Sequence, residues 1–483
     1  MTNDKARTTE KPGVIENVTV GSQSSRLSSV IFFLLCFVPV FTTVLFGGVD
    51  NTTWIIVTIC WLAIILMWLV EAWRAKGLIF ESSYLQLPLI GLLLIGLIQL
   101  LPFGSGVGDA SIAVPATNSL TLDPNGTRFF LSHLIVYIVF FAACLTFINS
   151  EKRLRKVVIL VVIFGAIMAF VAILLRLASP DMIYGLRNPG QAVPFGPFVN
   201  QHHFAAFMEM TGSVTLSLIL GKSALQDKRP LFMIALAVMS IAIILTSSRG
   251  GMIASITVIT FVLTMNFVIR KRSARSDEDK TEDRTLLQKA FTSTAIVGII
   301  LLLIGSVVFL GGSDALVRGV TMGAGTDDVS NGRLHFWWVA IKIFLDHPIL
   351  GAGLDAFGVA FTKHDTWHGI FRVEQAHNEY LQILAETGIV GFACIAAFIY
   401  LLFRKGLRTV ANAGSGFRQH AAIGALAGCL GILVHSFVDF PLRTPSNGFF
   451  FLLLVAIATV SVKTVSDGDS HRRKKHRSTS RSQ

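Results

Sequence analysis

Apolar runs of roughly 20 residues, the length that crosses a bilayer as a helix, recur along almost the whole chain. Short connectors rich in basic or turn-forming residues separate these runs. The pattern predicts an all-α polytopic membrane protein with about twelve transmembrane helices. The predicted spans are residues 28–48, 53–72, 84–102, 128–149, 157–177, 203–221, 230–247, 250–269, 291–311, 389–403, 420–438 and 447–464.

Composition supports the membrane interpretation. The 483-residue chain is 53% hydrophobic and 14% charged, whereas a soluble protein carries about a quarter charged residues. The formal charge of +12 therefore points to basic cytoplasmic connectors rather than to nucleic-acid binding. The five cysteines lie in or beside apolar runs and lack metal-ligand spacing, so we interpret them as small buried hydrophobes. They are Cys36, Cys60, Cys144, Cys394 and Cys429.

Lys and Arg concentrate in every second connector, which predicts the orientation of the helices. With the N-terminus inside, the basic connectors are cytoplasmic and both chain ends lie in the cytoplasm. The polar segment at the N-terminus does not have the form of a cleavable signal peptide. The predicted division is a cytoplasmic segment 1–27, transmembrane helices one to nine within 28–311, a large external loop 312–388, helices ten to twelve within 389–464, and a basic cytoplasmic tail 465–483.

The external loop 312–388 is the long polar segment in which chemistry is most expected. It carries more acidic than basic residues, so its arginines Arg318, Arg333 and Arg372 call for a reason. Apolar residues at helical spacing predict a helix over 334–345, with Arg333 at its start. The pair His347-Pro348 ends this helix, because the residue before proline disfavours helical geometry.

Arg249 lies between two apolar runs in the motif TSSRGG. An arginine at the membrane boundary requires a partner, a polar cavity or lipid headgroups. It is either an interfacial arginine on lipid headgroups or a cation aimed at a phosphate, whose oxygens its guanidinium fork matches. Arg333 is a second candidate phosphate-binding residue, because the start of a helix also attracts anions.

His377 lies in QAHNEYLQILAETG, where residues 374–386 read as an amphipathic helix that leads into the next membrane helix after Gly388. Histidine is the side chain best suited to take up a proton at neutral pH. Residue chemistry alone leaves two alternatives open, a general base and a hydrogen-bonded structural histidine.

Two further polar clusters lie at predicted external helix ends. Asn200 in FVNQHHFA is a candidate N-cap, and the adjacent pair His202-His203 does not share one helix face, which disfavours a metal site. Asp439 and Arg443 in HSFVDFPLR are expected to form a structural ion pair. The sequence contains no Walker-type phosphate loop, HExxH or GxSxG motif.

Together these pieces resemble the O-antigen ligase and O-antigen polymerase superfamily of bacterial membrane glycosyltransferases. The resemblance is carried by FVNQHHFA, TSSRGG, GRLHFWWVAIKIFLDHPILGAGLDAF, AHNEYLQILAETGIVG and HSFVDFPL. The segment from Gly332 to Gly391 is the specific part, while TSSRGG alone is a weak signal. The first and last pieces resemble the branch associated with exopolysaccharide and O-antigen polymerisation.

The resemblance implies a GT-C-like, metal-independent, inverting enzyme without a cofactor, in the bacterial inner membrane, with a periplasmic active site. It implies a donor glycan on undecaprenyl diphosphate, an acceptor that is a glycan or lipid A core, contact with membrane lipids, and a chain-length regulator as a further partner. By this resemblance Arg249 and Arg333 bind the diphosphate and His377 is catalytic. The residues that would support them are Asn200, His203, Asn378, Glu379, Arg318 and Arg372.

The alternative is a transporter or flippase of lipid-linked saccharides. A transporter built from two six-helix halves would carry its long connector inside, between helices six and seven. Here that connector is the short KSALQDKRP, and the long loop is predicted to be external. The sequence does not separate polymerase from ligase and does not name the glycan.

Overall fold

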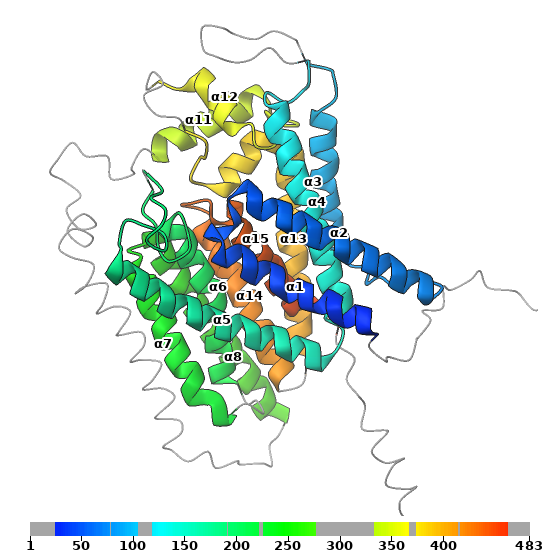
Figure 1. Cartoon of the computed structure of the whole chain (residues 1–483), viewed down its shortest axis with the longest axis vertical. Helices are drawn as coiled ribbons and strands as arrows, with labels where there is room; N and C mark the ends of the chain where they lie inside the picture. Colours follow the sequence, from blue (N-terminus) through cyan, green and yellow to red (C-terminus); the bar gives the residue numbers. More distant parts are fainter. Residues whose placement is uncertain are drawn as a thin grey trace, which may run out of the picture.

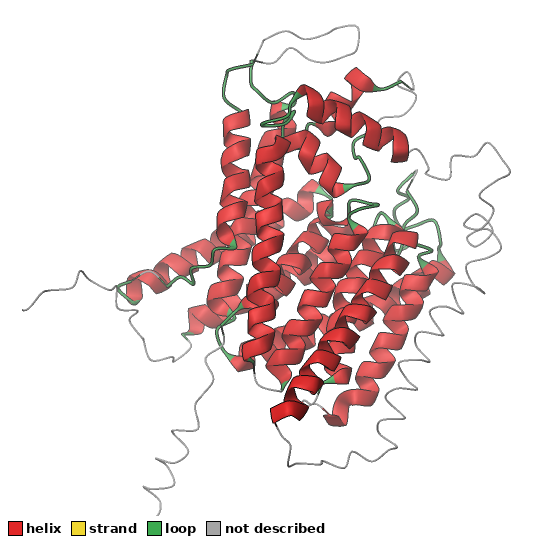
Figure 2. Ribbon diagram, turned by 180° about the vertical axis from the view of Figure 1, so that it is seen from behind, coloured by secondary structure: helices red, strands yellow, loops and turns green. Residues whose placement is uncertain are grey.

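The computed structural model describes residues 25–77, 79–104, 118–190, 192–221, 226–276, 333–366, 373–413 and 416–461. These parts are helices joined by loops, with two isolated backbone bridges and no named strand (Figures 1 and 2). The helices of the main bundle are α1 Arg26–Val44, α2 Asn51–Arg74, α3 Gln86–Gln99, α4 Pro124–Phe147, α5 Glu151–Ala178, α6 Gln201–Leu220, α7 Arg229–Leu245, α8 Arg249–Ser276, α13 Glu379–Asn412, α14 Phe417–His435 and α15 Pro445–Thr459. The remaining elements are α11 Arg333–Asp346, α12 Phe357–His364 and the 3-10 turns η1 Phe46–Gly48, η3 Gln226–Lys228 and η4 Pro441–Arg443.

Eight helices within the described ranges are long and apolar enough to cross a membrane, and α3, α7 and α15 are shorter apolar helices. These eleven coincide with eleven of the predicted spans. The twelfth, 291–311, lies outside the described residues, as do most of the N-terminal segment and the basic tail. The all-α polytopic fold is confirmed, while the division of the chain into cytoplasmic and external parts stays a prediction.

Several helices start at the capping residues that the sequence offers. Ser25 caps α1, Asp123 caps α4 just before Pro124, and Ser150 caps α5, each with a side-chain oxygen that accepts a backbone N–H. Asn200 caps α6 as predicted, accepting from the His202 N–H at 2.8 Å. Such caps satisfy N–H groups that have no partner inside the helix and would be costly to bury.

Helices α6 and α14 form the centre of the bundle, and α6 is buried along its whole length. They approach closely because Gly424 has no side chain. A Cβ at this position would lie 2.7 Å from the Val214 Cα. The core around them includes the aromatic rings of Phe207, Phe449 and Phe450.

Helices α11 and α12 lie beyond the end of the bundle and pack on the first turns of α13 (Figure 1). Their own small apolar core contains Val339, Ile343, Phe357 and Phe361. Helix α11 confirms the helix predicted for 334–345 and its end before His347. The helix predicted to begin at Glu374 is partly wrong, because residues 373–378 are irregular and α13 begins at Glu379.

Backbone hydrogen bonds join the loop after α11 to a break in α13. The Ala352 N–H donates to the Ala385 carbonyl at 2.9 Å, and the Gly353 N–H to the Glu386 carbonyl at 3.0 Å. Helix α13 leaves helical geometry at Gly388, with φ 61°, where a Cβ would lie 2.3 Å from the Ile349 carbonyl oxygen. Only glycine fits this position, so the loop is fixed against the membrane helix.

One side chain from α3 ties the same loop to the bundle. The Gln99 amide group donates to the Leu350 carbonyl at 2.6 Å and the Glu386 carbonyl at 2.8 Å. Its carbonyl oxygen accepts the Leu354 N–H at 2.9 Å. A fully buried glutamine thus satisfies three backbone groups at the point where α3, the loop and α13 meet.

Candidate active site

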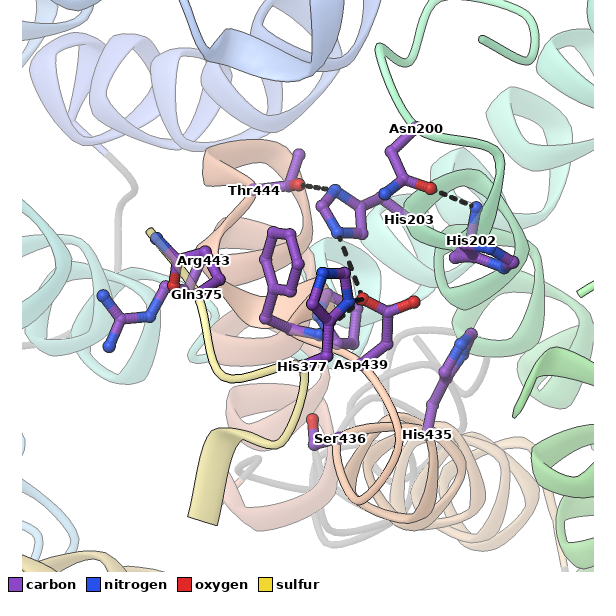
Figure 3. Close-up of polar contacts among 12 residues, drawn as sticks. Asn200, His202, His203, Gln375, His377, His435, Ser436, Asp439, Arg443 and Thr444 are labelled. Carbon is purple, nitrogen blue, oxygen red and sulfur yellow. Dashed lines mark hydrogen bonds and ion pairs between the residues drawn. The ribbon is translucent and has the colours of Figure 1, made fainter. Parts of the chain in front are cut away.

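Asp439 lies at the centre of a polar cluster just after α14, with a side chain that is 2% exposed. Its Oδ1 lies 3.4 Å from His377 Nδ1 and 3.9 Å from His203 Nε2, and its Oδ2 lies 3.7 Å from Arg333 Nη2. Figure 3 shows the His203 and His377 rings converging on this carboxylate. Residues from α6, α11, the segment before α13 and the segment after α14 therefore meet at one group.

The local structure after α14 presents the Asp439 carboxylate to the two histidines. The Phe440 N–H donates to Asp439 Oδ1 at 2.9 Å. The Phe440 ring contacts the rings of His203 and His377 edge-on, at centroid distances of 4.8 and 4.7 Å. The aromatic ring thus packs against both imidazoles beside the carboxylate.

The Asp439 carboxylate is ionised at neutral pH despite its burial. Burial by itself raises the pKa of this group, but the contact with His377 and the nearby His203 and His202 hold the pKa well below its usual range. A buried carboxylate that stays charged accepts hydrogen bonds and donates none. It therefore favours the proton on the His377 nitrogen that faces it.

His377 is held in a backbone conformation that non-glycine residues seldom adopt, with φ 50°. The following residue, Asn378, caps α13 by accepting the N–H groups of Tyr380 and Leu381 at 3.1 Å each. The Glu379 N–H donates to the Ser436 carbonyl at 3.0 Å. Left-handed geometry costs about 1–3 kcal/mol at such a residue and persists only where the surroundings impose it. The strain marks His377 as a positioned side chain.

The His377 ring has one nitrogen directed to Asp439 and one left for chemistry. The ring stacks on Phe336 of α11, with centroids 6.0 Å apart, and the side chain is 30% exposed. With Nδ1 facing a carboxylate, the neutral ring carries its proton there, and Nε2 holds the free lone pair. This arrangement suits a general base.

Arg249 begins α8 on a turn that is linked to the start of α6. The Ser248 hydroxyl lies 2.9 Å from His202 Nδ1 and accepts the Gly251 N–H at 3.1 Å. Arg249 is exposed, and within the described part of the chain it forms no ion pair or hydrogen bond. Its guanidinium is thus available to a ligand.

Beneath this turn lies a buried pair of titratable residues. His435 Nδ1 and Glu209 Oε1 lie 2.9 Å apart, and both side chains are fully buried. A Cβ at Gly250 would lie 2.8 Å from His435 Nε2, and one at Gly251 would lie 3.2 Å from Glu209 Oε1. The two glycines after Arg249 therefore allow α8 to start directly against this pair.

The prediction of an ion pair between Asp439 and Arg443 is wrong. Arg443 binds Glu386 at 2.6 Å and Asp355 at 3.1 Å, with Glu379 at 3.8 Å. The turn η4 carries Arg443 to the side of the His377 segment away from His203 (Figure 3). The two charges are four positions apart, but they are not on a continuous helix, so the spacing does not bring them together.

The other predicted site residues fall into three groups. His203, Arg333 and His377 surround Asp439, and Asn200 and Asn378 cap the helices on which two of these depend. Glu379 belongs to the Arg443 cluster instead. Arg318 and Arg372 lie outside the described residues. The structure adds Asp439 itself. An acidic residue inside the apolar piece HSFVDFPL is the signal that could have singled it out.

No group of three or more His, Cys, Asp or Glu side chains suited to hold a metal ion occurs within the described ranges. Among the described residues, Arg333 lies against Asp439, and Arg249 follows Ser248, which contacts His202 near the same carboxylate. Two arginines and a positioned histidine can bind an anionic group and accept a proton.

Residues 234–396 match the family model described as O-Antigen ligase. The resemblance to the O-antigen ligase and polymerase superfamily is confirmed. The matched region includes Arg249, Arg333 and His377, whereas His203 and Asp439 lie outside it. With its apolar helices, the chain is a multi-pass membrane protein, and its matched region resembles this superfamily.

Among curated proteins the chain is similar to the exopolysaccharide production protein ExoQ of Rhizobium meliloti (strain 1021). The two are 22% identical over 163 residues, which cover 32% of this chain and 36% of that protein. The chain thus matches about a third of the length of this relative.

Proposed function

We propose that this protein is a membrane glycosyltransferase that transfers a glycan from a lipid diphosphate to an acceptor hydroxyl. The observation that carries the proposal is the buried Asp439 carboxylate, which lies 3.4 Å from His377 Nδ1 and 3.7 Å from Arg333 Nη2, while His377 Nε2 has no partner among the described residues. A base and a cation next to one another are what this reaction requires.

In the proposed reaction the acceptor oxygen attacks the anomeric carbon of the donor sugar. His377 Nε2 takes the hydroxyl proton as the new carbon–oxygen bond forms. The bond between the anomeric carbon and the phosphate oxygen breaks, and its electron pair leaves with the diphosphate. Attack opposite the leaving group inverts the anomeric configuration. Asp439 stabilises the resulting imidazolium and keeps the ring oriented, so we assign it as a positioning residue.

Arg249 and Arg333 would bind the departing diphosphate. Each begins a helix, where backbone N–H groups also favour an anion, and guanidinium forks match phosphate oxygens. Two cations at the leaving group support a reaction that needs no metal. The Arg333 guanidinium already lies 3.7 Å from Asp439. It would therefore contact both a bound phosphate and the carboxylate that orients the base.

We propose polymerisation of an exopolysaccharide-type glycan rather than ligation to lipid A core. Its support is the name of the similar protein, which assigns that relative to exopolysaccharide production. We further propose undecaprenyl diphosphate as the donor lipid, the inner membrane as the location, both termini in the cytoplasm and the active site in the periplasm. The basic connectors of the sequence support this orientation.

The test uses a deletion strain that expresses the full chain or its variants. His377→Ala and Arg249→Ala should abolish polymer while lipid-linked repeat units accumulate. Arg187→Ala is the matched control, because Arg187 is an exposed arginine in the same end of the bundle and pairs with Asp50 instead. Normal polymer in both test variants would refute the proposal. Accumulation on the cytoplasmic face would instead indicate a flippase.

A further inference from the structure

A cavity of about 380 Å³ lies among α3, α4, α13 and α15. Most of its lining is apolar, including Leu92, Leu134, Phe398 and Phe451. Two other lining residues, Val49 and Phe129, are exposed on the outside of the bundle. The cavity therefore opens at the outside of the bundle, where an apolar chain can enter it.

The other end of the cavity is strongly polar. Arg443 lies there with Asp355, Glu379 and Glu386, at the distances given above. Three carboxylates surround one guanidinium, so the fully ionised group carries two net negative charges (three minus one). A buried charge excess of this kind has to be met by a ligand or by protonation.

One carboxylate oxygen in this group lacks a partner. Glu379 is 5% exposed, and its Oε1 accepts no hydrogen bond from the described residues. A buried acceptor without a donor is unfavourable. Since Glu379 lines the cavity, a hydroxyl or amine on a bound molecule would satisfy it.

This polar end borders the proposed active site. Gln375 and Glu379 line the cavity and are each two residues from His377. Ser436 also lines it, and its carbonyl accepts the Glu379 N–H. In Figure 3, Gln375 and Arg443 lie on one side of His377, and His202 and His203 lie on the other. The histidine thus stands between an acid-rich cavity and a side rich in cationic and imidazole groups.

We infer that this cavity is the binding site of an amphiphile with an apolar chain and an uncharged, hydroxyl-rich head. The carboxylates accept hydrogen bonds from the hydroxyls, and their charge excess rejects an anionic head. The site takes a neutral glycolipid and excludes a lipid phosphate. The inference goes beyond the proposed function, because it rests on the lining of the cavity and on the unpartnered Glu379 oxygen and not on the role of His377.

Binding can be measured without any transfer reaction. The full chain is placed in zwitterionic lipid nanodiscs and titrated by calorimetry with octyl β-glucoside or octyl phosphate below their micelle concentrations, with empty nanodiscs subtracted. We expect saturable binding of octyl glucoside and at least about tenfold weaker binding of octyl phosphate. Equal or tighter binding of the phosphate, or no saturable binding of the glucoside, would overturn the inference.

Two variants separate a specific site from general partition into the bilayer. Glu379→Gln keeps the shape of the side chain, and it should weaken octyl glucoside binding about tenfold and narrow the discrimination against octyl phosphate. Leu134→Trp should fill the cavity and abolish binding, whereas Leu66→Trp on the outward face of α2 should leave it unchanged. Unchanged discrimination in Glu379→Gln would contradict the assigned role.

The same assay distinguishes failure of this inference from failure of the proposed function. His377→Ala should still bind octyl glucoside while it loses transfer. If His377→Ala still transfers glycan and octyl glucoside binds as expected, the proposed function is refuted and the assignment of the cavity is supported. If transfer is lost but Glu379→Gln and Leu134→Trp leave binding unchanged, the cavity assignment fails alone.

Discussion

The Asp439 carboxylate and the His377 imidazole lie 3.4 Å apart. His377 lies just before the start of α13, and Asp439 lies just after the end of α14. The carboxylate is buried and charged, and the histidine is partly open and strained. In the proposed reaction, this pairing orients a loop histidine as the base.

Replacing Asp439 by Asn tests this relationship. The variant removes the charge that stabilises the imidazolium and allows the wrong tautomer of His377. We expect the transfer rate on a lipid-linked donor to fall roughly 100- to 10,000-fold. Donor binding should change little, because the two arginines remain. A rate within about threefold of the unmodified protein would show that Asp439 does not act through His377.

Gly250→Ala tests the close start of α8. The added Cβ would lie 2.7 Å from His435 Cδ2, which has no room to move in a buried pair with Glu209. We expect a loss of about 1–3 kcal/mol in stability, measured by thermal unfolding in detergent, together with reduced transfer as Arg249 shifts. Gly212→Ala is the control, since the nearest atom there is 3.9 Å away. Equal effects in both variants would contradict this account.

Gln99→Leu tests the tie between α3 and the loop. The change removes the partner of the Leu350 carbonyl and of the Leu354 N–H, while the Glu386 carbonyl keeps the Gly353 N–H as its donor, and it should destabilise the protein by at least about 2 kcal/mol. Gln86→Leu on the same helix should be close to neutral, because the Gln86 amide nitrogen is buried without a hydrogen bond to the described residues. Denaturant or thermal unfolding of both variants provides the comparison. A larger loss in Gln86→Leu would refute the assigned role of Gln99.

Asp355→Asn should change stability in a pH-dependent manner. Burial raises the pKa of Asp355 to about 6, which outweighs the lowering by Arg443, and Glu386 adds to the rise. The pKa of this acid is about 3.9 in the unfolded chain and higher in the folded protein. Such a group destabilises the folded protein increasingly as the pH rises from the first pKa through the second. The variant should therefore unfold about 2–4 °C higher than the unmodified protein at pH 8 and show little gain at pH 4.5. A lower unfolding temperature at pH 8 would mean that the Arg443 contact outweighs the charge excess.

The sequence by itself determined the helices and much of their local chemistry. Apolar runs require helices in a bilayer because every backbone group must be bonded within its own segment. For this reason eleven of the predicted spans are helices, α11 covers the predicted segment, and Asn200 caps α6 as expected. The motifs also singled out Arg249, Arg333 and His377 before any contact was known.

The tertiary structure alone decided the partners of these residues. Spacing suggested that Asp439 pairs with Arg443, but the turn η4 separates them, so Asp439 lies with His377 and Arg443 with three other acids. The Gln99 tie, the His435–Glu209 pair and the acid-lined cavity join segments far apart in the chain. Hydrophobic periodicity is local, whereas a buried polar group is satisfied by whatever packing brings to it, and that information is not carried by any single segment.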